Sequence, residues 1–315
     1  MSATTSSLAS RASIPPSTNL YHYTPTKGLC YLFVVLFAVT TLAHVFFAVR
    51  SRLWWLFPTV VLAGAGELIG WIARTSSSSD PTQRNDYIIQ STCLVLAPTP
   101  LLAAIFIIFG RLAQAIGSGY GRLTPRLYSR IFLTCDIVAL LIQGSGGGIA
   151  ASANNTSSQK LGSDIMLVGI IFQTVAMVVF IALAAEFFWR YAKDTPARPD
   201  AGYYSPGAAR RAPLSRNLKL MTLGLCLAML FLLVRAFYRV CELADGWNGR
   251  IISTQWLFNL FDGAMIVLTM YTLNAFHPGR LLPRTLPDPQ RQDSVLEVDK
   301  PLAYGQVETV AMRAV

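Results

Sequence analysis

Stretches of about 20 mostly apolar residues recur along the chain, and that length is what a helix needs to cross the hydrocarbon layer of a bilayer. Seven such stretches are found, at residues 28–49, 54–73, 88–109, 128–150, 165–189, 218–240 and 255–276. Only 13% of the 315 residues are charged, where a soluble domain has roughly a quarter. Lipid offers no partner to backbone N–H and C=O groups, so each span must be helical. The sequence therefore predicts an all-α polytopic membrane protein, a bundle of seven transmembrane helices.

The distribution of Lys and Arg predicts how the chain is inserted. With seven spans, the first, third and fifth connecting segments and the C-terminal tail share one side, and they carry eighteen of the 26 basic residues. The N-terminal tail and the other connections carry six. Basic residues accumulate in cytosolic segments, so we expect the N-terminus outside and the C-terminus in the cytosol. Overlapping glycosylation sequons at Asn154 and Asn155 fall in a connection that this topology places outside.

Three regions follow from this topology: an extracellular tail at 1–27, the transmembrane domain at 28–276 and a polar, proline-interrupted cytosolic tail at 277–315, expected to be disordered. The basic connection at 190–219 is a candidate for contact with a cytosolic partner. The net charge of +10 reflects these connections, so no nucleic-acid partner is expected. The chain has no P-loop, HExxH or G-x-S-x-G motif, and its five cysteines lack metal-site spacing. We expect a protein that is not an enzyme, with no metal and no cofactor.

Polar side chains inside the spans are the candidates for a functional site, because burying them in lipid is costly. A rise of 1.5 Å per residue places nearly all of them in the outer half of the membrane and Asp136 alone below the midplane. The outer-half set is Glu67, Gln90, Gln143, Gln173, Arg235, Tyr238, Arg239, Glu242 and Asp262. Their common level predicts a pocket that opens outward. The alternative is a structural ion-pair network that locks the bundle and binds no ligand.

The sixth span predicts specific ion pairs. Arg235, Tyr238, Arg239 and Glu242 have i, i+3, i+4, i+7 spacing, which places them on one helical face. Two arginines one turn apart repel unless acids lie nearby. We expect Glu242 to pair with Arg239, and Asp262 or Glu67 to pair with Arg235.

Other residues predict shape. Pro98 and Pro100 should break and bend the third span. The glycine run at 144–148 indicates either close helix packing or room for a substrate head group. Trp54, Trp55 and Trp71, at span ends, are expected to anchor the membrane interface.

Short motifs in a fixed order add a resemblance. They are Tyr23-x-Pro25; Gly66-Glu67-x-x-Gly70 with Arg74; Gln90 with Ala97-Pro98; Ala103-Ala104; Gly110-Arg111; Asp136 with Gln143-Gly144-x-Gly146-Gly147-Gly148; Gly169 with Gln173; Arg235-x-x-Tyr238-Arg239-x-x-Glu242 with Gly246-x-x-Gly249; Asp262; and His277-Pro278-Gly279. In these the chain resembles the fungal RTA-like, lipid-translocating exporter family, named for aminocholesterol resistance and sphingoid long-chain-base export. The resemblance covers nearly all of the membrane portion. Against the family pattern, Gln255 replaces a glutamate, Asn259 a tyrosine, Ala264 a proline and Phe106 an aromatic hydroxyl.

The resemblance implies seven spans, an outside N-terminus and a place in the plasma membrane. It also implies export or flipping of sphingoid bases, resistance to toxic amphiphiles or, in one branch, porphyrin handling. The leading hypothesis is therefore a transporter of lipid-like amphiphiles, with the bilayer and the amphiphile as partners. A seven-span ligand sensor in the stress response and a stress-response scaffold with purely structural charges are the alternatives.

Overall fold

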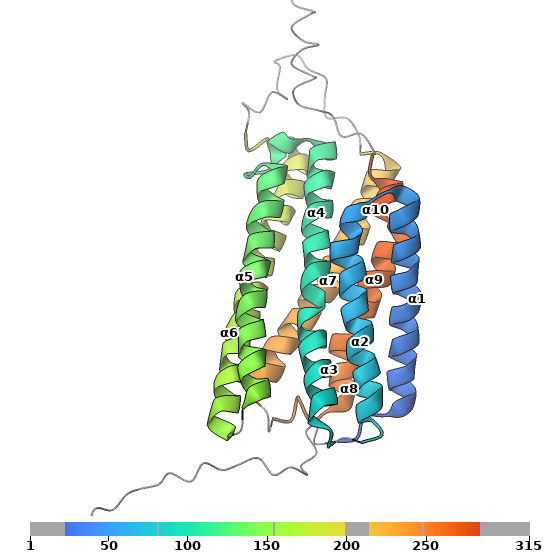
Figure 1. Ribbon diagram of the computed structural model, residues 1–315. Helices are drawn as coiled ribbons and strands as arrows, with labels where there is room; N and C mark the ends of the chain where they lie inside the picture. The colour runs from blue at the N-terminus through green and yellow to red at the C-terminus, as the bar shows by residue number, and fades with distance from the viewer. Residues whose placement is uncertain (1–22, 81, 154, 199–213, 247–248, 284–315) are drawn as a thin grey trace, which may run out of the picture. The chain divides into compact units, whose positions relative to one another are not determined.

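A computed structural model of the chain describes residues 23–80, 82–153, 155–198, 214–246 and 249–283 (Figure 1). Their regular secondary structure is helical, and seven helical segments are long and apolar enough to cross a membrane. The prediction of an all-α bundle with seven spans is thus confirmed. The outside N-terminus and the cytosolic C-terminus stay predictions.

Several of the seven segments are interrupted, so they comprise more than seven helices. They are α1 (Lys27–Ser51); η1 (Trp54–Leu56), η2 (Phe57–Val61) and α2 (Leu62–Ser77); α3 (Arg84–Leu96) and α4 (Pro98–Ile116); α5 (Pro125–Ser152); α6 (Thr156–Lys193); α7 (Arg216–Asp245); and α8 (Gln255–Phe258), η4 (Asn259–Ala264), α9 (Met265–Ala275) and α10 (Pro278–Leu281). A short 3-10 turn, η3 (Ser118–Tyr120), lies between α4 and α5.

The helical spans are longer than the apolar runs that predicted them, and three of them, α5, α6 and α7, begin at a polar residue whose side chain caps the helix. Asn155 shows this most clearly: its side-chain oxygen accepts the backbone N–H of Ser158 at 2.7 Å, and α6 begins directly after it. The fifth span therefore starts at Thr156, nine residues before the predicted start at 165. Asn154 lies outside the described residues.

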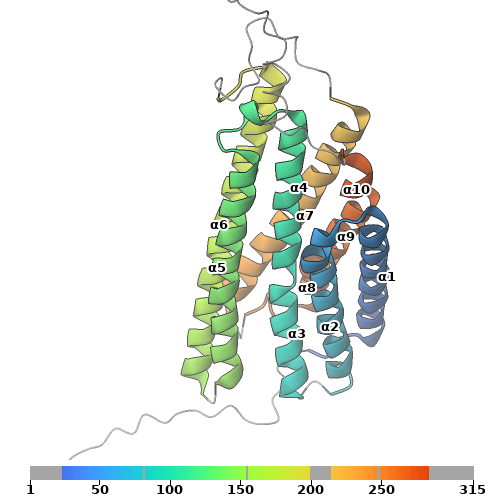
Figure 2. The ribbon, with the colours of Figure 1, turned by 45° about the horizontal axis from the view of Figure 1, so that its top comes forward.

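The helices form a bundle in which α5 and α6 run side by side along one edge, and α1 and α2 lie at the opposite edge (Figures 1 and 2). Between these pairs lies α4, and α7 contacts α4, α6 and α9. The outer face of α1 exposes Tyr31, Val35, Leu42 and Phe46 at helical spacing. Such a face is costly in water and suits lipid.

The third span is interrupted where Pro98 was expected to break it: α3 ends at Leu96 and α4 begins at Pro98. Proline has no N–H, so the carbonyl of Leu94 has no donor four residues ahead. That carbonyl accepts a hydrogen bond from a side chain of another helix, as described below.

Trp71 does not anchor the interface, contrary to our prediction. Its side chain is fully buried, and its ring stacks on Phe33 at a centroid distance of 4.1 Å. The reason is that α2 continues to Ser77, so Trp71 lies inside the bundle and not at the end of its span. Trp54, in contrast, is 64% exposed.

The first compact unit of the chain runs to Leu282, beyond the predicted end of the membrane domain at 276. His277 is fully buried, and its Nδ1 accepts the backbone N–H of Gly279 at the start of α10. The predicted disordered tail lies mainly at 284–315, and most of the predicted N-terminal tail at 1–22; both stretches are outside the described residues.

Within the glycine run, Gly146 makes a close helix contact. A Cβ at this position would lie 2.6 Å from the backbone nitrogen of Met166 and 2.7 Å from the backbone oxygen of Gly162, so α5 and α6 meet backbone to backbone. Gly148 has nothing within 4 Å of the same hypothetical atom. Close packing through a small residue, one of the two interpretations of the run, therefore explains Gly146 but not Gly148.

This contrast generates a matched test. Gly146→Ala should destabilise the bundle by about 1–3 kcal/mol, because the added methyl group must push two backbones apart. Gly148→Ala should be neutral or slightly stabilising, since alanine favours a helix over glycine. Thermal unfolding of both purified variants in detergent checks this; equal melting temperatures would contradict the close contact.

Candidate functional site

One face of α7 carries Arg235, Tyr238, Arg239 and Glu242, and all four side chains are buried. Arg239 donates from Nη1 to Oε2 of Glu242 at 2.7 Å, and Tyr238 donates its hydroxyl to Oε1 of Glu242 at 3.1 Å. The predicted pair of Glu242 with Arg239 is therefore confirmed. It uses the i, i+3 geometry that the spacing indicated.

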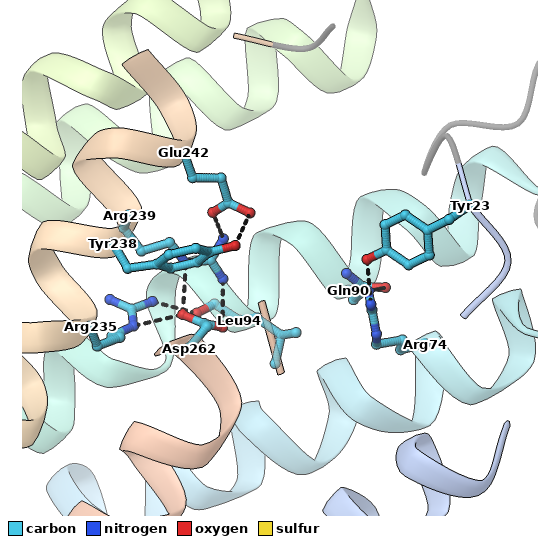
Figure 3. Close-up of polar contacts among 9 residues, drawn as sticks. All are labelled: Tyr23, Arg74, Gln90, Leu94, Arg235, Tyr238, Arg239, Glu242 and Asp262. Atoms are coloured by element: carbon cyan, nitrogen blue, oxygen red, sulfur yellow. Dashed lines mark hydrogen bonds and ion pairs between the residues drawn. The ribbon is translucent and has the colours of Figure 1, made fainter. Parts of the chain in front are cut away.

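Asp262, from η4, joins both arginines (Figure 3). Its Oδ1 lies 3.0 Å from Nε of Arg235 and 2.8 Å from Nε of Arg239, and its Oδ2 lies 2.8 Å from Nη2 of Arg239. The side chain is fully buried. One carboxylate thus holds together two guanidinium groups that would otherwise repel. The structure confirms the predicted pair with Arg235 and adds the second pair, which the sequence did not predict.

Two irregular backbone segments complete this network. η4 is a π-helical turn, a widened helix that is frequent at functional sites. Nη2 of Arg235 donates to the carbonyl oxygen of Leu94 at 2.9 Å, which is the carbonyl that Pro98 leaves without a partner. The break in the third span therefore supplies a hydrogen-bond acceptor to an arginine that is also ion-paired. We call Arg235, Arg239, Glu242 and Asp262 the ion-pair network.

Glu67 of α2 lies beside this network without joining it. Its carboxylate is fully buried, and neither oxygen accepts a hydrogen bond from a described residue. The charged groups acting on it are Asp262, Arg235 and Arg239. The indole N–H of Trp71, one turn farther along α2, is near enough to influence this carboxylate, but neither group makes a hydrogen bond of acceptable geometry to a described residue. Glu67 is thus a fifth buried ionisable residue beside the four of the network, and it accepts no hydrogen bond from either arginine.

A pocket that is partly open to its surroundings lies where α2 and α7 end and α3, α6 and α8 begin; its empty space, including the open space at its mouth, is about 730 Å³. Its polar wall includes Arg74, Tyr87, Gln90, Ser91, Ser163 and Glu242. Its apolar wall consists of Leu94, Val95, Met166, Leu243, Ile252 and Phe258. This is the end of the bundle that the predicted topology places outside.

Arg74 forms the side of the pocket opposite α7 (Figure 3). Its Nη2 donates to the hydroxyl of Tyr23 at 2.6 Å, and its Nη1 donates to Oε1 of Gln90 at 3.2 Å. The guanidinium carbon lies 4.4 Å from the ring centroid of Phe258. Our sequence-based list of site residues omitted Arg74 and Tyr23, although both belong to the motifs that carried the family resemblance.

Gln143, Gln173 and Asp136 lie apart from this pocket. Gln143 donates to Oε1 of Gln173 at 2.9 Å, and Gln173 donates to Oγ1 of Thr99 at 3.2 Å, between α4, α5 and α6. Gln173 and Arg235 both line a smaller cavity that is also partly open; its empty space, including the open space at its mouth, is about 350 Å³. The structure thus does not bring the whole predicted set into one pocket. Gln90, Arg239 and Glu242 line the first pocket, Gln173 and Arg235 line the second, and the other outer-half residues line neither of these two: Glu67, Gln143, Tyr238 and Asp262.

Asp136 is buried on α5, near Gln173, and its Oδ2 has no hydrogen-bond partner among the described residues. The structure also gives the surroundings of three of the four positions that depart from the family pattern. Oε1 of Gln255 accepts the hydroxyl of Thr26 at 3.1 Å, and Asn259 is buried at the start of η4. Phe106 packs on Phe180 at a centroid distance of 4.5 Å, in an aromatic core that needs no hydroxyl.

The chain matches a known family over most of its length. The sequence profile described as "RTA1 like protein" matches residues 60–285. Protein RTA1 of Saccharomyces cerevisiae is 30% identical over 283 residues, which cover 82% of this chain and 84% of the relative.

Two further relatives from the same yeast have names that state a cargo. Sphingoid long-chain base transporter RSB1 is 26% identical over 267 residues, covering 78% of this chain and 70% of the relative. Protoporphyrin uptake protein 1 is 27% identical over 297 residues, covering 82% and 92%. No solved structure matches the chain.

The ion-pair network predicts a strong effect of Asp262→Asn. Replacing one partner leaves two buried guanidinium groups without their shared counter-charge, and breaking a buried pair in this way costs about 3–5 kcal/mol. We expect a large fall in melting temperature and in yield of folded protein. Asp164→Asn, at an exposed acid of α6, is the control. An Asp262→Asn protein as stable as this control would contradict the network's structural role.

Proposed function

The chain belongs to the RTA1-like protein family, and from this premise we propose that it is a membrane transporter of lipid-like amphiphiles. The proposed cargo is a sphingoid long-chain base or a molecule of similar build. Such a base has an amine and hydroxyl groups at the head of one long alkyl chain. The relatives' names mention a sphingoid long-chain base and protoporphyrin, and both molecules combine ionisable groups with a large apolar part.

The observation that carries this proposal is a pocket whose lining is both polar and apolar. An amphiphile needs polar partners for its head and an apolar surface for its chain, and the residues that line the pocket offer both. The apolar wall is formed by side chains of α3, α6, α7, α8 and the residues just before α8. A site built only as an internal ion-pair lock would not require such an opening.

The head group has defined partners in this proposal. The carboxylate of Glu242 is the acid of the pocket wall, and it would accept the ammonium as a charge-assisted hydrogen bond. Gln90, Ser91 and Ser163 supply amide and hydroxyl groups for the hydroxyls of the head. The alkyl chain would lie along Leu94, Met166 and Leu243. The rigid position of Glu242 between Arg239 and Tyr238 supports this role, because a fixed acceptor loses little entropy on binding.

The proposed topology places the pocket at the outer leaflet of the plasma membrane, with the N-terminus outside and the C-terminus in the cytosol. Release of toxic amphiphiles from this side would confer resistance to them. The connection at 190–219 would then be cytosolic and available to a partner; its residues 199–213 lie outside the described part of the chain. The sequence has no nucleotide-binding motif, so movement would be driven by the cargo's own gradient, by an ion or by another protein.

The test is the movement of a fluorescent long-chain base across liposomes that contain the purified protein. Glu242→Gln should slow protein-dependent movement roughly ten- to hundredfold, because a charge-assisted hydrogen bond contributes about 1.5–3 kcal/mol. The amide keeps the shape of the side chain and an oxygen that can accept from Arg239. Glu186→Gln, an acid that pairs with Arg122 and Arg190 away from the pocket, is the matched control and should behave like the wild type.

A folded wild-type protein that moves no base above protein-free liposomes would contradict the proposal. In that case, recruitment of a cytosolic protein to the 190–219 connection on addition of the base would favour the ligand sensor.

A further inference from the structure

The charges of the ion-pair network balance without Glu67. Arg235 and Arg239 supply two positive charges, and Asp262 and Glu242 supply two negative charges. The hydrogen bonds that the structure assigns to the two guanidinium groups end on those acids or on the carbonyl of Leu94. Glu67 is therefore the surplus acid of the cluster.

Glu67 lies deeper than the pocket wall but level with the network. It precedes Arg74, which lines the pocket, by seven residues, and at 1.5 Å per residue this is about 10 Å along α2. The same spacing separates Arg235 from Glu242 on α7, and Asp262 contacts Arg235 directly. Asp262 and Arg239 thus connect the pocket to the level of Glu67.

An ionised carboxylate that is fully buried and has no hydrogen-bond donor is strongly disfavoured. The titratable groups that face Glu67 are few: Cys93 on α3, Arg235 and Arg239 on α7, and Asp262 on η4. Both arginines are already held by acids, and Asp262 adds a like charge.

The titratable groups on the helices around α2 lie elsewhere. On α1, which packs against α2, Cys30 and His44 contact the carbonyls of Arg74 and Met270 instead. The titratable residue of α4 is Arg111. It lies five residues before the C-terminal end of α4, which is the end remote from the pocket. Glu67 can therefore become neutral in two ways, by holding a proton or by holding a cation.

We propose that Glu67 holds either one proton or one cationic head group, and that this makes the protein an exchanger of protons for cationic amphiphiles. The inference rests on the proposed function and adds its energy source. When the ammonium reaches Glu67, the carboxyl O–H bond breaks, the proton leaves to water and the carboxylate pairs with the cation. When the cation leaves, a proton from water re-forms the O–H bond. One positive charge replaces another, so the exchange moves no net charge.

The first measurement needs no transport. Infrared difference spectra of the purified protein at neutral pH should show the carbonyl band of a protonated carboxyl group that is absent from Glu67→Gln. In Asp136→Asn, which removes a different buried acid, this band should remain. Dihydrosphingosine should abolish the band, and its N-acylated, uncharged analogue should leave it in place. A wild-type spectrum without the band would show that Glu67 is ionised in the empty protein and would overturn the exchange.

The second measurement counts protons in liposomes with an internal pH dye. The cargo is a long-chain base with a quaternary ammonium, which has no proton to lose, so every proton counted comes through the protein. We expect one proton to move against each cation, and an imposed pH gradient to drive accumulation at least tenfold above protein-free liposomes. Glu67→Gln should abolish this accumulation, while Glu186→Gln should retain it.

The outcomes separate the two proposals. Movement of the cation without protons, or movement indifferent to the pH gradient, would leave the transporter in place and overturn the exchange. No movement of the cation or of the unmodified base by a folded protein would overturn the proposed function and the exchange with it, even if the infrared band were present.

Discussion

The carboxylate of Asp262, held between two buried arginines, is the interaction on which the rest of the site depends. Two guanidinium groups one helical turn apart inside a membrane domain are tolerable only where acids neutralise them. Asp262 neutralises both, and Glu242 adds a second acid to Arg239. The π-helical turn that carries Asp262 and the proline that frees the carbonyl of Leu94 are best understood as parts of this arrangement. The irregular backbone segments of two spans, the third and the seventh, thus supply partners to the arginines of α7.

The network also divides the interior of the bundle. Arg239 and Glu242 border the pocket with the apolar wall, whereas Arg235 borders the smaller cavity beside Gln173. Glu67 lies deeper than the pocket wall, at the level of the network, and its carboxylate accepts no hydrogen bond from a described residue. A cargo in the pocket is therefore separated from the level of Glu67 by paired charges, and any movement past them requires those pairs to rearrange. Coupling a proton to that rearrangement would use the one acid of the cluster that is not already paired.

Much of this could be predicted from the sequence, and the limits have physical causes. Apolar runs of membrane-spanning length determine the number of spans, and i, i+3 spacing was sufficient for the pair Glu242–Arg239. For Arg235, depth along the spans left two acids as partners, Asp262 and Glu67, and the structure shows Asp262. Depth along a span gives the height of a residue but not the direction in which it faces. For that reason depth alone assigns Gln143 and Gln173 to the same pocket as Glu242. In the structure, Gln143 donates to Gln173 and Gln173 donates to Thr99, away from that pocket. The second pair of Asp262 depends on a π-helical turn, which a periodicity of 3.6 residues cannot indicate. Trp71 was misplaced because its helix continues beyond the apolar run.

In the proposed function, a lipid-like cation binds in the pocket formed by α3, α6, α7 and the residues leading into α8. Photo-crosslinking with a photoactivatable long-chain base, followed by mapping of the labelled peptides, tests this binding. We expect label on the apolar wall, at Leu94, Met166, Leu243 and Ile252, which an excess of unlabelled base removes and an uncharged N-acylated analogue does not. Label spread over the lipid-facing surface of α1, or confined to the cavity beside Gln173, would contradict it.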